Sequence, residues 1–138
     1  MNSNIANQIA KLLNSNNQLV KKYTENKVLE TKDNYVYIVK DSTVIACAES
    51  KKVQWYQSEI SHLSVSEKFQ GEGYAKKILT RAESKAIEDG AKIIQCTIRK
   101  DNKRSISLFK GFKYSIVNEF YYNHSGNWVL VLQKTIHK

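Results

Sequence analysis

The sequence predicts a single α/β domain with a mixed central sheet of about six to seven strands and about four flanking helices. Its 138 residues have the length of one domain. An apolar run, a long amphipathic helix and a second apolar run follow one another, as in parallel strands joined by a crossover helix. Further short runs are rich in β-branched and aromatic residues. We expect a helical region over 1–30 and the sheet and core over 31–138.

Composition narrows the class of protein. Hydrophobic residues make up 41% and charged residues 25% of the chain, as in globular proteins. No apolar run approaches the ~20 residues of a membrane span, and the N-terminus lacks a signal-peptide pattern. Cys47 and Cys96 lack metal-binding or redox spacing, which favours buried free thiols and no bound metal. We therefore expect a cytoplasmic protein that does not contact a membrane.

The formal net charge of +9 predicts a surface that attracts anions. A coenzyme with several phosphates is one such partner. A nucleic acid is less favoured, because the lysines are scattered and the longest basic runs are pairs.

Helical spacing of apolar residues predicts a first helix from Ile5 to Leu13, with Ser3 as its N-cap. A polar break follows. We expect a second short helix that ends near Asn26 and carries Leu19, Val20 and Tyr23.

Two runs of β-forming residues, Tyr35–Lys40 and Thr43–Ala48, predict a hairpin that turns at Asp41 and Ser42. A third run, Val53–Val65, is long for one strand. We therefore expect one strand with an irregularity, such as a β-bulge, inside it.

Gly71 and Gly73 stand between this run and the long amphipathic helix. A helix N-terminus leaves backbone N–H groups unpaired, and glycine allows a close approach, so the junction is typical of a phosphate site. The helix should end at Gly90, and a buried strand should follow over 91–98.

The last third predicts a helix through Ile106 and Phe109, capped by Asp101 or Asn102 and ended by Gly111. Two final strands, over 113–122 and 128–133, should form a hairpin.

The glycine segment resembles the acetyl-CoA motif of the GNAT superfamily of N-acetyltransferases, Q/R-x-x-G-x-G/A. Gln70, Gly73 and Ala75 fill its defined positions. Neither a Walker A loop nor a Rossmann fingerprint fits, because no Gly-Lys-Ser/Thr follows and the third spaced glycine is missing.

A second segment resembles the family pattern N-x-x-A-x-x-L-Y ending in G-F. It begins at Asn102 and reaches Phe109, where many members have a tyrosine, and the span before Gly111 is shorter than usual. The resemblance covers the chain from about Thr43 to the end, and the first third matches only in general layout.

The resemblance implies a GNAT-like fold in which a bulged strand splays from its parallel neighbour and holds acetyl-CoA. The backbone of Leu63 and Val65 would then contact the pantetheine arm. The coenzyme-binding residues that it implies are Leu63, Ser64, Val65, Gln70, Gly71, Glu72, Gly73, Tyr74, Ala75, Lys76, Asn102, Ser105 and Phe109.

Acetyl transfer to an amine needs a base that removes the amine proton. Glu59 aligns with the strand position from which some GNAT enzymes supply a glutamate base. The alternative is that it is an exposed strand carboxylate beside a cross-strand lysine. His62 ranks second as the base, because an imidazole titrates near neutrality. Strand alternation puts the two side chains on opposite faces unless a bulge intervenes.

The sequence does not identify the general acid that protonates the thiolate of coenzyme A, since Phe109 has no hydroxyl. Solvent or one of four tyrosines could serve: Tyr74, Tyr114, Tyr121 or Tyr122.

We therefore expect an N-acetyltransferase that moves an acetyl group from acetyl-CoA to a primary amine of an unidentified acceptor, by direct attack in a ternary complex. The alternatives are a non-catalytic acyl-CoA-binding or nucleic-acid-binding domain on the same fold, and an acetylating toxin that acts on charged tRNA. Whether the chain forms a homodimer is left open.

Overall fold

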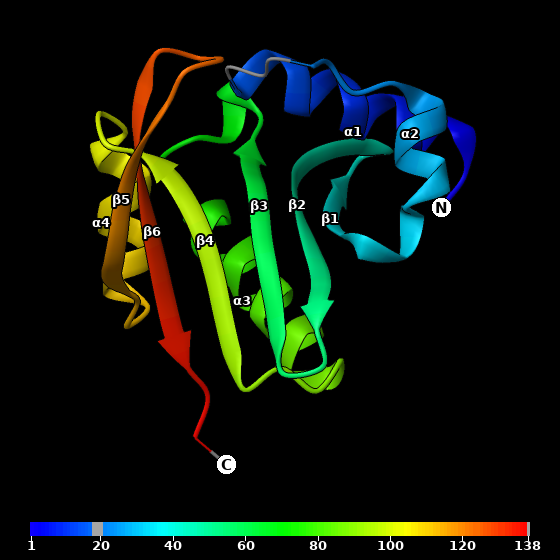
Figure 1. Cartoon of the computed structure of the whole chain (residues 1–138). Coiled ribbons are helices and arrows are strands. Elements are labelled where there is room, and N and C mark those ends of the chain that lie inside the picture. Colours follow the sequence, from blue (N-terminus) through cyan, green and yellow to red (C-terminus); the bar gives the residue numbers. More distant parts are fainter. Residues whose placement is uncertain (18–20, 138) are drawn as a thin grey trace.

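A computed structural model describes residues 1–17 and 21–137. One mixed sheet holds the strands in the order β1-β2-β3-β4-β6-β5 (Figure 1). No helix in these ranges is long and apolar enough to cross a membrane. In chain order the elements are α1 (Ser3–Asn16), α2 (Glu25–Glu30), β1 (Tyr35–Lys40), β2 (Thr43–Gln54), β3 (Gln57–Val65), α3 (Tyr74–Glu88), β4 (Ile93–Arg99), α4 (Lys103–Gly111), β5 (Ser115–Tyr122) and β6 (Asn127–Thr135), with short 3-10 turns at Lys32–Asn34 and Glu67–Phe69.

The two faces of the sheet are covered by different helices. Ile78 and Leu79 of α3 and Phe109 of α4 pack with one buried cluster of strand residues. Ile9 and Leu13 of α1 belong to a second buried cluster on the opposite face, over β1 and β2. The expected α/β domain with a mixed sheet is confirmed, and its six strands lie within the expected range.

Side-chain caps fix where the N-terminal helices begin. Asn2, and not the predicted Ser3, caps α1, because its Oδ1 accepts the N–H of Ile5 at 2.8 Å. Thr24 caps α2 by accepting the N–H of Lys27 at 3.1 Å.

The predicted second helix was placed too early in the chain. Asn14 holds the backbone of Tyr23 just before the Thr24 cap, since its side chain binds both the Tyr23 N–H and C=O at 2.8 Å. Tyr23 therefore precedes α2, which runs past Asn26. The predicted positions Leu19 and Val20 lie outside the described residues.

The β1–β2 hairpin turns at Asp41 and Ser42, as predicted, with φ values of 50° and 64°. The third apolar run is not one strand, however. β2 continues to Gln54, the chain turns at Trp55 and Tyr56, and β3 begins only at Gln57. The prediction missed this turn because it lacks the glycine, asparagine or aspartate that usually marks one.

The expected bulge is present in β3. Cys47 pairs with Ser64 and Glu49 with Ser61, so His62 and Leu63 together oppose one residue of β2. His62 has a φ of 55°, in the left-handed region. Histidine is among the residues enriched there.

β3 and β4 are parallel neighbours over only three register pairs, from Gln57–Ile93 to Glu59–Gln95. Beyond Glu59 the strands separate, and the bulge lies on the separated part of β3. The expected splay between parallel neighbours is confirmed.

The end of α3 and the start of α4 follow the predicted signals. Gly90, with a φ of 92°, ends α3, and the Ala91 N–H returns to the Ala86 carbonyl at 3.0 Å. Asn102 rather than Asp101 caps α4, by accepting the N–H of Ser105 at 3.2 Å.

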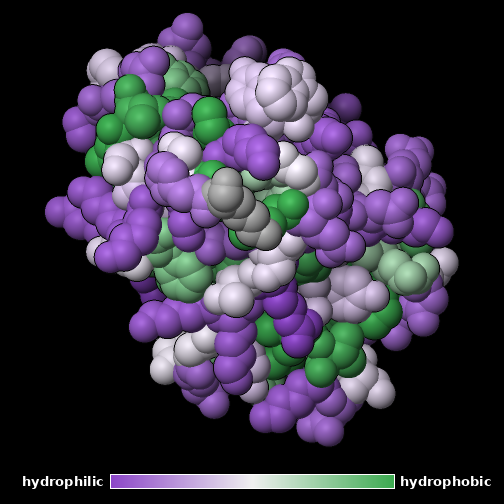
Figure 2. Space-filling model, turned by 90° about the horizontal axis from the view of Figure 1, so that it is seen from below, coloured by the Kyte–Doolittle hydropathy of each residue, from purple (hydrophilic) through white to green (hydrophobic). Residues whose placement is uncertain are grey.

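Figure 2 shows the end of the molecule that lies at the bottom of Figure 1, where hydrophilic side chains dominate and hydrophobic ones form small separate groups. The separated ends of β3 and β4 lie at the other end (Figure 1).

Candidate functional site

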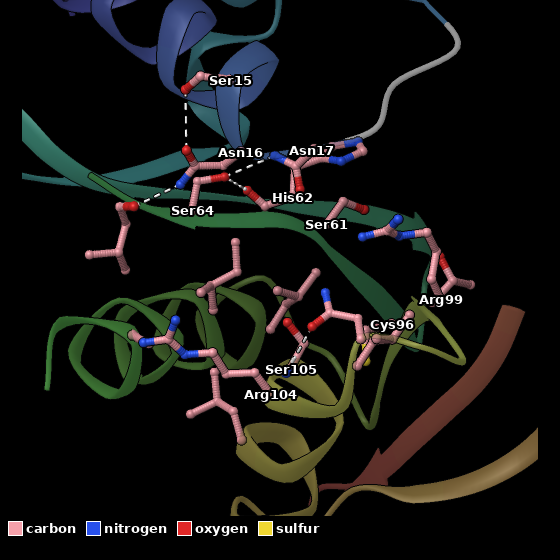
Figure 3. A pocket seen from close by; sticks show the side chains of 18 of the residues that line it. Ser15, Asn16, Asn17, Ser61, His62, Ser64, Cys96, Arg99, Arg104 and Ser105 are labelled. Carbon is pink, nitrogen blue, oxygen red and sulfur yellow. Dashed lines mark hydrogen bonds between the residues drawn. The ribbon is translucent and has the colours of Figure 1, made fainter. Parts of the chain in front are cut away.

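A groove of about 1580 Å³ opens where β3 and β4 separate. Its lining comes from the end of α1, the segment before α2, β3, the start of α3, β4, α4 and the β5–β6 turn. In the close view, Ser61, His62 and Ser64 of β3 lie across the opening from Cys96 of β4 and Ser105 of α4 (Figure 3). The groove therefore connects the side of the sheet that carries α3 and α4 with the side that carries α1 and α2.

The N-terminus of α3 forms one wall of this groove. Gly71 and Gly73 have φ values of 81° and 86°, and a Cβ added to either would meet nothing within 4 Å. Glycine is therefore favoured here by backbone conformation and not by packing. Among the α-helices in the described ranges, α3 alone has no side-chain cap. Its first N–H groups remain available to an anion.

The end of β3 is tied to neighbouring side chains. The Val65 carbonyl accepts from Asn16 Nδ2 at 2.7 Å and from Gln70 Nε2 at 3.1 Å. Ser64 Oγ donates to the His62 carbonyl and accepts from Asn17 Nδ2, both at 2.9 Å. Protein donors thus occupy both lone pairs of the Val65 carbonyl, while Leu63 lies within the bulge.

Most of the predicted coenzyme-binding residues line the groove. Glu72 and Tyr74 do not line it: the Glu72 side chain is exposed, and the Tyr74 ring packs against Phe69 with centroids 5.9 Å apart. Those that line it are Leu63, Ser64, Val65, Gln70, Gly71, Gly73, Ala75, Lys76, Asn102, Ser105 and Phe109.

Glu59 lies at the last paired position before the strands separate and is not among the groove-lining residues. Gln95 Nε2 donates to its Oε2 at 3.3 Å, and Gln133 Nε2 donates to Gln95 Oε1 at 2.7 Å. Burial raises the pKa of the Glu59 carboxyl, against the smaller lowering effects of Gln95 and Lys51. The carboxylate is therefore a stronger base than an exposed glutamate, placed at the vertex of the opening.

His62 lines the groove within the bulge. Its ring meets the Tyr23 ring edge to face, with centroids 5.4 Å apart. Burial lowers the pKa of the imidazole, and the Glu49 carboxylate partly offsets this effect. Burial therefore favours the neutral imidazole, which can accept a proton but is a weaker base than an exposed histidine.

The hydroxyl that Phe109 lacks is not supplied by Tyr114. Phe109 is buried and meets the Tyr114 ring at 5.0 Å, but the Tyr114 hydroxyl donates to Glu83 at 2.8 Å. Burial and the Glu83 carboxylate raise the Tyr114 pKa. Of the four tyrosines considered as acids, Tyr122 is the one that lines the groove.

Several groove residues were missed by the sequence analysis, among them Asn16, Asn17, Tyr23, Ser61 and Arg99. Asn16 and Asn17 looked like a polar break between helices, and Tyr23 looked like a helix position. Arg99 carried a signal that could have been used, since it ends a buried strand and directly precedes a loop and a helix cap. Within 1–17 and 21–137, no group of three or more histidine, cysteine, aspartate and glutamate side chains could hold a metal ion.

Solved structures show the same fold at low sequence identity. Ard1 from Thermoplasma volcanium has a TM-score of 0.85 and 16% identity, and the alignment covers 100% of this chain and 95% of that one. The ribosomal-protein-alanine N-acetyltransferase from Brucella melitensis has a TM-score of 0.82, 14% identity and coverage of 99% and 97%. The yncA protein from Salmonella typhimurium, solved with its cofactor acetyl-CoA, has a TM-score of 0.84, 14% identity and coverage of 100% and 92%.

A comparison with curated proteins gave no match. A comparison with protein families matched residues 7–114 to the model described as the acetyltransferase (GNAT) family. This match extends well before Thr43, where the sequence motifs had suggested that the resemblance begins. The chain belongs to the acetyltransferase (GNAT) family.

Proposed function

We propose that this protein transfers the acetyl group of acetyl-CoA to a primary amine of an acceptor, with both substrates bound together. One observation carries the proposal: the groove begins at the uncapped glycine N-terminus of α3 and passes between the separated ends of β3 and β4 to the opposite face of the sheet. A thioester and an amine can therefore approach each other from two sides. The yncA structure, which has this fold, holds acetyl-CoA as its cofactor.

The coenzyme is proposed to bind on the α3 and α4 side. Its pyrophosphate would accept hydrogen bonds from the first N–H groups of α3, next to Gly71 and Gly73. Lys76 and Arg104 line this part of the groove and supply positive charge. The pantetheine arm would then run along the bulge at Leu63, where β3 has separated from β4.

The acetyl transfer needs no covalent enzyme intermediate. The neutral amine nitrogen attacks the thioester carbonyl carbon, a C–N bond forms, the C–S bond breaks, and the thiolate of coenzyme A takes up a proton. An ammonium ion must first lose one proton to become this neutral amine, and the nitrogen loses a second proton as the amide forms. Glu59, acting through water that passes these protons to solvent, is the proposed base, with His62 as the alternative. Tyr122 or solvent would protonate the thiolate, which is a fair leaving group because a thiol pKa is about 8.5.

Isothermal titration calorimetry with acetyl-CoA tests the coenzyme site. Gly73→Asp should weaken binding by at least ~10-fold, since it places a carboxylate at the phosphate position and strains a residue with a φ of 86°. Gly90→Asp is the matched control, because Gly90 has a φ of 92° and lies at the other end of the same helix. Equal affinities for folded Gly73→Asp and the control would show that the phosphate site is elsewhere.

Phe109 favours one alternative, a domain that binds acyl-CoA without catalysis. Its buried ring occupies the place where many family members have a tyrosine hydroxyl. Incubation with acetyl-CoA and a panel of amines separates the two functions. Mass spectrometry should detect N-acetylated product if the protein is an enzyme, and only coenzyme binding if it is not.

A further inference from the structure

Arg99 places a positive charge on the α1 and α2 side of the groove. Cys96 and Ile98 of β4 are buried toward α3 and α4, so Thr97 and Arg99 alternate to the opposite face. The Arg99 side chain is 29% exposed and lines the groove. In the close view its guanidinium is turned toward Ser61, at the β3 edge of the opening (Figure 3). The group therefore points toward the side from which an amine would approach the thioester.

This guanidinium is not matched by a closely bound carboxylate. Within the described part of the chain its one ion pair is with Asp101, where Nε and Oδ1 are 4.0 Å apart and the aspartate side chain is 73% exposed. A separation of 4.0 Å is too long for a hydrogen bond. The five N–H donors of an arginine suit a planar carboxylate, so this half-buried cation is poised for an anionic ligand.

Lysines add positive charge to this side of the groove. Lys21, Lys22 and Lys27, from the segment around Tyr23 and from α2, also line it, against a single lining acid from that segment, Glu30. The Glu49 carboxylate already accepts the Tyr23 hydroxyl at 3.3 Å. The phosphates of a coenzyme would lie with Lys76 and Arg104 on the other side of the sheet. A coenzyme therefore does not account for the positive charge around Arg99.

We propose that the acceptor is an amine that carries a carboxylate near its amino group, and that Arg99 binds this carboxylate. The inference rests on the proposed acetyl transfer and names its acceptor class. A free α-amino acid and a peptide with an acidic first residue share this chemistry. A polyamine or a lysine-rich tail does not, because its extra positive charges would be repelled by Arg99 and the three lysines.

The test compares matched amines with acetyl-CoA as donor. L-alanine carries the carboxylate of a free amino acid, and L-alaninamide has an amide in its place. The peptide Glu-Ala-Ala-amide has an acidic first residue, and Gln-Ala-Ala-amide is its neutral counterpart. Spermidine represents polycations. We expect kcat/KM to be roughly 10- to 100-fold higher for the carboxylate member of at least one pair, as for a hydrogen bond to a charged group. Preference for the neutral members or for spermidine overturns the inference.

Arg99→Gln should remove this preference. It should lower kcat/KM for the preferred carboxylate amine by roughly 10- to 100-fold, change that of its neutral partner by less than about twofold, and leave KM for acetyl-CoA unaltered. Lys52→Gln removes one positive charge from an exposed strand position that does not line the groove, and it should preserve the preference. If Arg99→Gln lowers kcat/KM equally for both amines, Arg99 has a structural role and does not bind the carboxylate.

A binding measurement separates this inference from the proposed catalysis. The acetylated peptides Ac-Glu-Ala-Ala-amide and Ac-Gln-Ala-Ala-amide, together with N-acetyl-L-alanine and its amide, are titrated into the coenzyme A complex by NMR. Carboxylate-selective binding that Arg99→Gln abolishes supports the subsite even without turnover. If turnover occurs but neither rates nor binding depend on the carboxylate, the inference is wrong while the transferase proposal stands.

Discussion

The carboxyl group of Glu59 is partly buried, which favours its neutral form. It sits at the last paired position of β3 and β4, opposite Lys51 on β2, with Gln95 as its hydrogen-bond donor. Burial raises its pKa more than these two partners lower it. A carboxylate removes the proton of an amine more efficiently when its pKa lies closer to the pH of the reaction.

Replacing Glu59 by glutamine tests its role as the base. Glu59→Gln keeps the shape, so affinity for acetyl-CoA should be unchanged while kcat falls by ~10²–10⁴-fold. The rate should partly recover at high pH, where the amine deprotonates without help. Steady-state acetyl transfer across pH measures this effect, with His62→Gln as the comparison. A kcat within about threefold of the parent would remove Glu59 from the mechanism and favour His62 or solvent.

The same variant should be more stable than the parent at neutral pH. A carboxyl whose pKa is raised on folding stabilises the fold while it is protonated, and this contribution is lost as pH rises through the folded pKa. At pH 7 the buried carboxylate is therefore a cost that Glu59→Gln removes. Below the ordinary value of 4.5 both side chains are neutral and the difference should vanish.

Thermal unfolding at pH 7 and pH 4 checks this prediction. The expected result is a higher Tm for Glu59→Gln at pH 7 and nearly equal values at pH 4. A lower Tm for the variant at pH 7 would mean that the pair of Glu59 with Lys51 outweighs the desolvation of the carboxylate.

The sequence motifs predicted where the groove lies more accurately than which individual residues line it. Gln70, Gly73 and Ala75 were predicted from their spacing, and all three line the groove. Glu72 and Tyr74 belong to the same stretch but do not line the groove, and the roles of Glu59 and His62 stay predictions. Motif spacing gives sequence position, whereas side-chain direction depends on the local backbone and on neighbours such as Phe69.

Among the elements, α3 is joined to the last strand by a charged cluster. Lys134 of β6 pairs with Glu83 of α3 at 2.9 Å, and the Tyr114 hydroxyl donates to the same carboxylate. The side chains of Lys134 and Glu83 are 22% and 12% exposed. The cluster thus holds in place the helix whose N-terminus forms one wall of the groove.

Breaking this cluster should destabilise the fold. Lys134→Met leaves Glu83 largely buried without its cation and should lower the free energy of unfolding by about 2–4 kcal/mol. Lys100→Met is the control, because the side chains of Lys100 and its partner Glu119 are 60% and 37% exposed, and such a surface pair contributes at most about 1 kcal/mol. Urea unfolding measures both, and equal losses would show that burial of the Glu83–Lys134 pair adds nothing.

Element boundaries were predicted well where a cap, a glycine or a common turn residue marked them. Gly90 and Asn102 are examples, since each satisfies backbone groups at a helix end. The turn at Trp55 and the start of α2 were missed. At the first, aromatic residues stand where turn residues are usual, and at the second, the long-range bonds of Asn14 to Tyr23 fix the chain.

For the whole molecule, the charge of +9 should assist the binding of an anionic coenzyme. Affinity for coenzyme A should fall as ionic strength rises, because salt screens Lys76, Arg104 and the net field. The affinity for dephospho-coenzyme A, which lacks the terminal phosphate, should fall less steeply as ionic strength rises. Titrations at three salt concentrations measure the two slopes, and equal slopes would exclude a contribution of protein charge at the terminal phosphate.

The overall architecture was predictable because local signals agreed with one another. The two predicted hairpins, β1–β2 and β5–β6, and the crossover unit are all present, and the crossover makes β3 and β4 parallel neighbours. The hairpin of β2 with β3 is the connection that the sequence did not predict. The placement of α1 and α2 over the opposite face was not predictable from local pattern. It depends on contacts distant in sequence, such as Asn16 with Val65 and Asn17 with Ser64.

The proposed site for acetyl-CoA runs from the bulge of β3 to the N-terminus of α3. Titration of acetyl-CoA into the ¹⁵N-labelled protein, followed through backbone amide shifts, tests this site residue by residue. We expect saturable binding with the largest changes at Leu63, Gly71, Gly73, Ala75 and Lys76. Saturable changes confined to other regions, such as the exposed strand β5, would contradict it, as would the absence of binding.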